Sequence, residues 1–237
     1  MRKKITRFSL MMLCVFLLGN SIPTAQASVQ SPPVELVAAS EFGLVFEVTV
    51  PWQSLTLQET QAEGKNYTQI ILPGYLQSLE EGAPQVPMLV ETIGIPFGVE
   101  LELKVTPGKA HTQSFSAQIM PVETQKTSIN APSEGAQFFD SYSIITERIA
   151  DPHVYRSAEQ YPDVLAEVSN IGTIRQQRVV GISLYPVQVS PLNQKVTIYE
   201  SLRVEVKFKG KVEPTQVGFP KPESAEYERF FESTLLN

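Results

Sequence analysis

Apolar and polar residues alternate along most of this chain, and this period of two predicts β-strands with one buried face. Two clear early runs cover residues 42–50 and 99–105, and they end at Pro51 and at the turn Pro107-Gly108. The apolar positions are Phe42, Leu44, Phe46, Val48 and Val50 in the first run, Val99, Leu101, Leu103 and Val105 in the second, and Phe115, Ala117 and Ile119 in a shorter third run.

A hairpin is predicted in the C-terminal third of the chain. Residues 180–184 alternate, SPLNQ at 190–194 predicts a turn, and residues 196–208 form the longest alternating run. The other face of that run is polar. Antiparallel pairing is therefore expected, because parallel strands are usually buried on both faces.

Prolines interrupt another apolar segment, EEGAPQVPMLVETIGIP at residues 80–96. Pro84, Pro87 and Pro96 lack a backbone N–H, so this segment cannot lie in the middle of a sheet throughout its length. It fits an edge strand or a crossing between two sheets.

Helical patterns are scarce. Residues 155–168 could hold a turn or two, and residues 224–237 (SAEYERFFESTLLN) space their apolar side chains as in a short helix. Residues 121–155 have no clear period, and a loop of that length is usually functional or mobile. The pattern predicts an all-β fold, an antiparallel β-sandwich or open barrel with a short C-terminal helix.

The N-terminal residues predict export. A basic start precedes the apolar stretch FSLMMLCVFLL, and Ala25 and Ala27 form an A-x-A cleavage site, which together are typical of a signal peptide at residues 1–27. The expected location is secreted, periplasmic or extracellular. We expect a flexible leader at 28–33, a sandwich domain at 34–208, and a linker with the short helix at 209–237.

Charge and cysteine usage narrow the possible functions. Four of the 19 Lys and Arg lie in residues 1–27, which contain no Asp or Glu, so cleavage shifts the net charge from −6 to −10. Nucleic acids and anionic membranes are unsuitable partners for so acidic a chain. The one cysteine, Cys14, lies in the predicted signal, and the two histidines, His111 and His153, lie in polar stretches. We expect no catalytic residue, no metal site and no cofactor.

Three longer stretches together carry a resemblance to a known family. They are GYLQSLEEGAPQVPMLVETIGIP, RVVGISLYPVQVSPLNQKVTIYESLRVEVKF and YERFFESTLLN. Gly82, Pro84 and Pro87 precede an apolar strand, and Tyr185-Pro186 opens a motif that is followed by a long alternating strand. In these features the chain resembles the N-terminal propeptide domain of gingipain-type cysteine peptidases.

The resemblance implies a domain that assists folding of a gingipain-like cysteine peptidase catalytic domain, in cis or in trans, and that keeps it latent by covering its cleft. The chain itself is not expected to be an enzyme, because the part after residue 27 has no Cys-His pair. Asn237 falls where a catalytic domain is expected to begin, which favours a precursor fragment over a free-standing relative.

The resemblance also implies a basic side chain on a loop that enters the specificity pocket of the peptidase. Lys126, in VETQKTSINAPSEG, is the first candidate for this inhibitory residue. Arg148 and Arg156 are the alternatives.

Two other functions remain open from the residues alone. A secreted β-sandwich that binds carbohydrate or protein would use exposed aromatic side chains such as Trp52, Tyr67 and Tyr75 as stacking platforms. An enzyme on the same scaffold would use carboxylates such as Glu80, Glu81 and Asp140.

Overall fold

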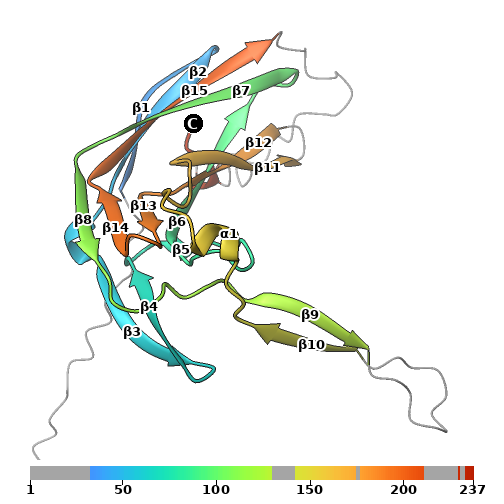
Figure 1. Ribbon diagram of the computed structural model, residues 1–237. Helices are drawn as coiled ribbons and strands as arrows, with labels where there is room; N and C mark the ends of the chain where they lie inside the picture. Colours follow the sequence, from blue (N-terminus) through green and yellow to red (C-terminus); the bar gives the residue numbers. More distant parts are fainter. Residues whose placement is uncertain (1–32, 130–141, 175–176, 211–228, 230–232) are drawn as a thin grey trace, which may run out of the picture.

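The computed structural model describes residues 33–129, 142–174, 177–210, 229 and 233–237 (Figure 1). The predicted signal peptide with Ala25 and Ala27, almost all of the predicted leader, and Asp140 lie outside these residues. The predicted all-β class is confirmed, because nearly every element is a strand and all pairings between named strands are antiparallel.

Two four-stranded sheets form the sandwich. The first has the order β1-β2-β15-β7 and the second the order β11-β12-β6-β5. The strands of the first are β1 (Val34–Ser40), β2 (Gly43–Thr49), β15 (Ser201–Gly210) and β7 (Val99–Pro107). Those of the second are β11 (Ala166–Ile174), β12 (Gln177–Leu184), β6 (Pro87–Ile95) and β5 (Leu76–Gln77).

Apolar side chains from both sheets meet in one buried cluster, here called the sandwich core. Its members are Leu44, Phe46, Val48, Ile93, Ile95, Val99, Val180, Ile182, Leu184, Leu202, Val204 and Val206. In β2, β7, β12 and β15 alternate residues point inward, which is why the period of two in the sequence predicts these four strands.

A second core lies under a three-stranded sheet, β13 (Val187–Ser190), β14 (Lys195–Tyr199) and β8 (Ala110–Ser114), in the order β13-β14-β8. The hairpin of β3 (Thr56–Ala62) and β4 (Lys65–Ile71) packs beside it, with a short 3-10 helix η1 (Trp52–Ser54) leading in. Members of this core include Ile70, Leu72, Val86, Phe115, Ile119, Val187, Val189, Val196 and Ile198.

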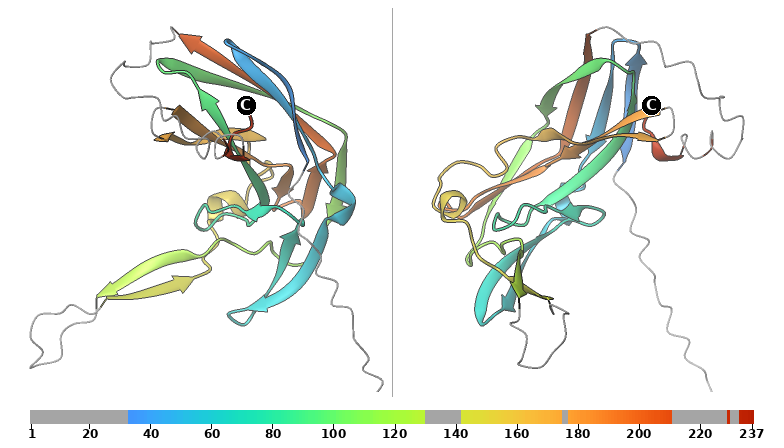
Figure 2. Two further views of the ribbon diagram at one scale, coloured as in Figure 1. Left: turned by 180° about the vertical axis from the view of Figure 1, so that it is seen from behind. Right: turned by 90° about the vertical axis from the view of Figure 1, so that its right-hand side faces the viewer.

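One long ribbon of chain joins the two cores. β14 continues into β15 at Glu200, β7 continues into β8 after Gly108, and the two pairs hydrogen-bond to each other on both sides of this junction. The four strands follow the outer side of the curved molecule (Figures 1 and 2). The predicted single strand at 196–208 is therefore two strands in two sheets.

Several local predictions were wrong. Phe42 is 73% exposed, because it lies in the turn between β1 and β2. The SPLNQ turn joins β13 to β14, whereas residues 180–184 belong to β12, which pairs with β11 and β6. Residues 115–119 are buried at Phe115 and Ile119 but form no named strand, since only Ile119 makes a single bridge, to Thr68.

The helical predictions also need correction. A turn or two of helix was predicted within residues 155–168, but the helix α1 covers Pro152–Tyr155 and ends where that range begins. Residues 166–174 form the strand β11. Asp151 caps α1 by accepting a hydrogen bond from the His153 N–H. In the predicted C-terminal helix the described residues Arg229, Ser233 and Thr234 are helical, and most of the rest lies outside the described part of the chain.

The proline-rich segment leads into β6, which lies between β12 and the two-residue strand β5. Pro87 is its first residue and pairs with Gln77, and Pro84 bridges to Pro121 ahead of it. The prolines therefore lie where a missing N–H breaks no central ladder.

Candidate functional site: the β9–β10 arm

A two-stranded ribbon projects from the curved body (Figures 1 and 2). It consists of β9 (Thr124–Ile129) and β10 (Tyr142–Glu147), paired from Thr124↔Glu147 to Ile129↔Tyr142, and is called the arm below. Its described residues belong to neither core. An isolated two-stranded ribbon is only marginally stable, so contacts at the base of the arm have to hold it in place.

Arg148 supplies the main contacts at this base. Its guanidinium forms ion pairs with Glu123 and, through Nη1 at 3.4 Å, with Oε1 of Glu63. Its backbone N–H also donates to Glu63 Oε1 at 3.3 Å, and Glu63 lies in the turn between β3 and β4. The Arg148 side chain is only 22% exposed, so these ion pairs are partly shielded from water.

A second contact comes from the loop before β6. The backbone N–H of Gln125 in β9 donates to Glu81 Oε1 at 3.5 Å. Together with the Arg148 pairs, this contact ties both strands of the arm to the body. Glu81, considered as a catalytic carboxylate, thus lies at the base of the arm.

Lys126 lies on the arm itself. It pairs with Ile145 across the ribbon, and its Nζ is 2.8 Å from Oε2 of Glu147. Roughly half of its side chain is exposed, so the ion pair is an open surface one that contributes little to stability and exchanges easily.

Arg156 lies elsewhere, at the C-cap of α1, where it is exposed. The structure therefore places Lys126 and Arg148 on the same projecting element, with Arg148 committed to its base. Arg156 lies outside the arm.

Apolar side chains are exposed along the arm. Ile144 is 68% exposed and Ile145 is 46% exposed, and Ile149 is also exposed just after β10. Neighbouring strand residues point to opposite faces, so Ile144 and Ile145 present apolar surface on both sides of the ribbon. Grouped apolar exposure of this kind is typical of a surface that contacts another protein.

A groove of about 650 Å³ lies on the face of the second sheet that points away from the sandwich core. Two tyrosine hydroxyls donate to carboxylates in its wall, Tyr161 to Glu80 at 2.7 Å and Tyr185 to Glu167 at 2.6 Å. Burial, followed by these carboxylates, raises the pKa of both tyrosines. Both hydroxyls therefore stay protonated at neutral pH and act as donors, Tyr161 to the loop before β6 and Tyr185 to β11.

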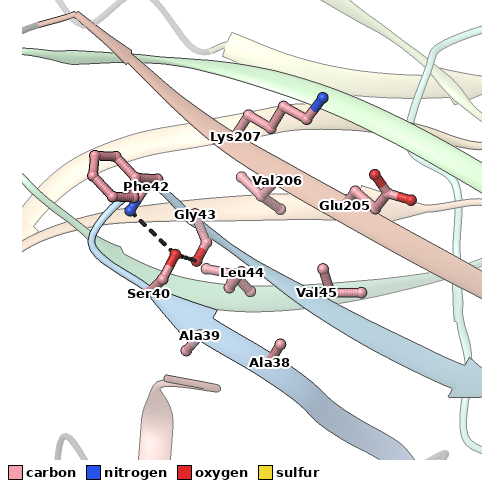
Figure 3. A pocket seen from close by; sticks show the side chains of 10 residues that line it. All are labelled: Ala38, Ala39, Ser40, Phe42, Gly43, Leu44, Val45, Glu205, Val206 and Lys207. Carbon is pink, nitrogen blue, oxygen red and sulfur yellow. Dashed lines mark hydrogen bonds between the residues drawn. The ribbon is translucent and has the colours of Figure 1, made fainter.

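A smaller hollow of about 220 Å³ lies at the turn between β1 and β2 (Figure 3). Ser40 Oγ donates to the Gly43 carbonyl and accepts from the Phe42 N–H, both at 3.2 Å, as the dashed lines show. Gly43 has φ +147°, and a Cβ there would lie 2.1 Å from the Val206 carbonyl oxygen. The hollow is thus the outside of a tight turn packed on β15.

The aromatic residues considered as a carbohydrate platform are used for packing. Trp52 stacks on His111 with ring centroids 3.7 Å apart, and His111 Nε2 lies 2.7 Å from Glu200 Oε1. Tyr67 is buried, and Tyr75 packs against the second core. The three side chains do not form an exposed stacking surface.

The described residues show neither a cluster of metal ligands nor a membrane-spanning helix. Within those ranges, no three His, Cys, Asp or Glu side chains are grouped closely enough to hold a metal ion. In the same part of the chain, no helix has the length and apolar character needed to cross a membrane.

The family resemblance led to Lys126, which lies on the arm, but the sequence did not predict the arm or its base. Residues 125–127 and 144–146 of the arm are all exposed, so no buried face marks them with a period, and Arg148 is joined to Glu63 over 85 residues of sequence. The only sequence signal was negative, namely the long stretch without a period.

The chain is similar to several known proteins. Lys-gingipain and Lys-gingipain W83 of Porphyromonas gingivalis are each 22% identical to it over 208 residues, which cover 85% of this chain but 11% of theirs. The chain therefore spans about a tenth of the length of these curated relatives.

Two solved structures share the fold. The complex of Porphyromonas gingivalis RgpB pro- and mature domains has a TM-score of 0.64 at 17% identity, covering 88% of this chain and 99% of that one. A structure described as giving insight into zymogenic latency of gingipain K from the same organism has a TM-score of 0.57 at 18% identity, covering 76% and 93%. The model of the family Propeptide_C25 matches residues 25–219, and this chain therefore belongs to that family of propeptides, as its resemblance to gingipain propeptides predicted.

Proposed function

We propose that this chain is the propeptide of an exported gingipain-like cysteine peptidase, which it helps to fold and keeps latent by covering the catalytic cleft. Its membership of the Propeptide_C25 family supports this role. The observation that carries it is the arm, a projecting ribbon with exposed isoleucines and a lysine, clamped at its base. The peptidase domain, in cis or in trans, is the partner.

The arm suits a cleft that binds extended chains. A strand presents an extended backbone and alternating side chains, which is the shape that a peptidase cleft takes as substrate. A rigid base reduces the entropy that is lost on binding and keeps the ribbon from adapting to the geometry of cleavage. Ile144 and Ile145 supply apolar contact area, and Lys126 supplies a positive charge.

The folding role rests on the body. Its two cores bury apolar side chains from all along the described chain, so the body can order before a partner does and can present a preformed surface. Broad contact with this surface would favour the native arrangement of the peptidase domain over open ones.

The proposal also includes export of the chain and the boundaries of its domains. A signal peptide at 1–27, with cleavage after Ala27, directs the chain out of the cytoplasm, and gingipain kinship agrees with that location. We place the leader at 28–33, the propeptide sandwich at 34–208, and the linker that leads toward a peptidase domain at 209–237.

The test is inhibition of the cognate peptidase by the purified chain from residue 28 onward. The chain should inhibit, and the double variant Ile144→Ser/Ile145→Ser should raise the inhibition constant by about tenfold or more, because apolar contact area is lost from both faces of the arm. Circular dichroism of the variant should match the parent, since both side chains are exposed.

The matched control is Leu76→Ser/Leu79→Ser, which removes two exposed leucines beside the groove and away from the arm. Inhibition should be unchanged in this control. Equal loss of inhibition in both double variants would move the contact surface off the arm, and absence of inhibition by the parent chain would refute the proposed function.

A further inference from the structure

Strand β6 has an edge that other strands leave largely open. One side of β6 pairs with β12 along Leu89–Ile95, whereas on the other side β5 reaches only Pro87 and Met88. Among the described residues, no other named strand pairs with that second side from Leu89 onward. An exposed edge of this kind is a template for an added strand.

The C-terminal residues Leu235–Asn237 occupy this edge. The Leu236 N–H donates to the Thr92 carbonyl at 2.9 Å. The side chain of Asn237 then makes two further bonds to one residue: its Oδ1 accepts from the Gly94 N–H at 2.8 Å, and its Nδ2 donates to the Gly94 carbonyl at 3.1 Å. A carboxamide offers the same donor and acceptor as a peptide unit, so Asn237 takes the place of one paired strand residue.

The two leucines make different contacts at the same edge. Leu236 packs against the sandwich core. Leu235 lies beside Gly94, where an added Cβ would be 3.4 Å from Leu235 Cδ1 and 3.1 Å from Gln177 Nε2. Because Gly94 has no side chain, the side chain of Leu235 can approach the backbone of β6 at this position.

We propose that the β6 edge at Thr92–Gly94 is a peptide-binding site of the strand-addition type, selective for an extended Leu-Leu-Asn sequence, and that Leu235–Asn237 is its resident ligand. Backbone hydrogen bonds provide affinity in such sites, and pockets for alternate side chains provide selectivity. Here the selectivity comes from the sandwich core under Leu236 and from the paired groups of Gly94.

The site joins parts of the chain that are 143 residues apart in sequence. While it is filled, the β6 edge is closed to pairing with another molecule. In a longer precursor it would fix the point from which the following residues leave the domain. The site does not depend on the inhibitory role of the arm.

The experiment is amide hydrogen exchange, resolved by NMR, on the full chain from residue 28 and on Asn237→Ala. The variant loses both bonds to Gly94, so exchange at Gly94 and Leu236 should accelerate by about tenfold or more, as expected for loss of one to two hydrogen bonds. The Leu103 amide in β7, on the first sheet, should exchange at the parent rate.

Two further measurements make the test specific. Asn66→Ala, which changes an exposed asparagine of β4, should leave all three amides unchanged. Adding excess amidated peptide Ser-Thr-Leu-Leu-Asn to Asn237→Ala should restore protection at Gly94, and the same peptide with Ala in place of Asn should need about tenfold more.

Unchanged exchange at Gly94 in Asn237→Ala would overturn the proposal. So would equal acceleration at Leu103, which would indicate general destabilisation, or equal rescue by the Asn and Ala peptides.

Discussion

Lys126 and Arg148 are both basic residues of the arm region, but their surroundings give them different roles. Lys126 has one surface ion pair with Glu147 and a half-exposed side chain, so it can exchange that partner for another carboxylate. Arg148 is held by two carboxylates and is mostly covered. Of these two residues, Lys126 is therefore the one that we propose for contact with the peptidase.

Replacing Lys126 with alanine should weaken inhibition of the cognate peptidase by about tenfold, which is roughly 1.4 kcal/mol, because one charge-assisted contact is lost. Inhibition constants for Lys126→Ala and for Arg156→Ala, which changes an exposed arginine off the arm, provide the comparison. A constant that is unchanged in Lys126→Ala would remove this lysine from the contact surface and would leave the rest of the arm in place.

Glu91 is an acidic residue on the inward-facing side of β6, between Leu89 and Ile93. Burial raises the pKa of Glu91, so the folded state favours the protonated carboxyl more than the unfolded state does. The stability linked to this group is present at low pH and is lost as pH rises through the raised pKa.

Glu91→Gln should therefore unfold at a higher urea concentration than the parent at pH 7. The advantage should shrink as pH falls toward and below the ordinary carboxyl range, where both side chains are neutral. Urea midpoints at pH 7 and pH 4 measure it, with Glu100→Gln on the exposed face of β7 as control. A larger advantage at pH 4 than at pH 7 would contradict the assigned cause.

The arm is the element whose stability depends most on contacts with the rest of the chain. It has two strands, its residues 125–127 and 144–146 are exposed, and Arg148 and Glu81 link it to the body. Its order should therefore be lost locally, well before the cores unfold.

Arg148→Met keeps much of the side-chain volume but removes both ion pairs at the base. Amides of β9 and β10 should exchange several-fold faster, while the midpoint of global unfolding should change little, because the arm belongs to neither core. Hydrogen exchange and a urea titration on the same sample measure the two effects. A large fall in the global midpoint with unchanged arm exchange would show that Arg148 stabilises the body instead.

The strands that the sequence predicts well are those with one buried face. β2, β7 and β15 keep a period of two because one face of each packs on the sandwich core. Residues 196–208 keep the same parity across Glu200, so the change of sheet leaves no mark in the pattern. It depends instead on the pairing of β14 with β8 and of β15 with β2 and β7, and these partner strands are distant in sequence.

The site was predictable only in part for the same physical reason. Residues 125–127 and 144–146 of the arm are exposed, so no period marks them, and Glu63 and Glu123 become partners of Arg148 only through folding. Phe42 extended an apolar run by one position, but the turn to β2 places it outside the buried face. Hydrophobic patterns in the sequence predict which residues are buried, and they do not predict functional elements whose residues are exposed.

The molecule as a whole has two cores joined by one ribbon. Ile198 in β14 belongs to the second core and Leu202 in β15 belongs to the sandwich core, and both are fully buried on either side of Glu200. Because β14 continues into β15 and β8 into β7, neither core can lose its strands without disturbing the other. Unfolding is expected to be a single transition.

Ile198→Ala and Leu202→Ala should each lower the free energy of unfolding by about 2–5 kcal/mol, since each deletes a buried aliphatic side chain and leaves a cavity. Both variants should still unfold in one step in urea, followed by circular dichroism. Thr197→Ala is the control, because it changes a β14 residue that belongs to neither core. Two separated transitions in either core variant would show that the cores are independent.

Trp52 is the only tryptophan in the chain, and its indole lies face to face with His111 beside the second core. Its fluorescence is therefore a built-in optical reporter of that one region. Emission should shift to longer wavelength when the second core melts and stay constant when only the arm loosens, so a single cuvette measurement distinguishes the two events without any label.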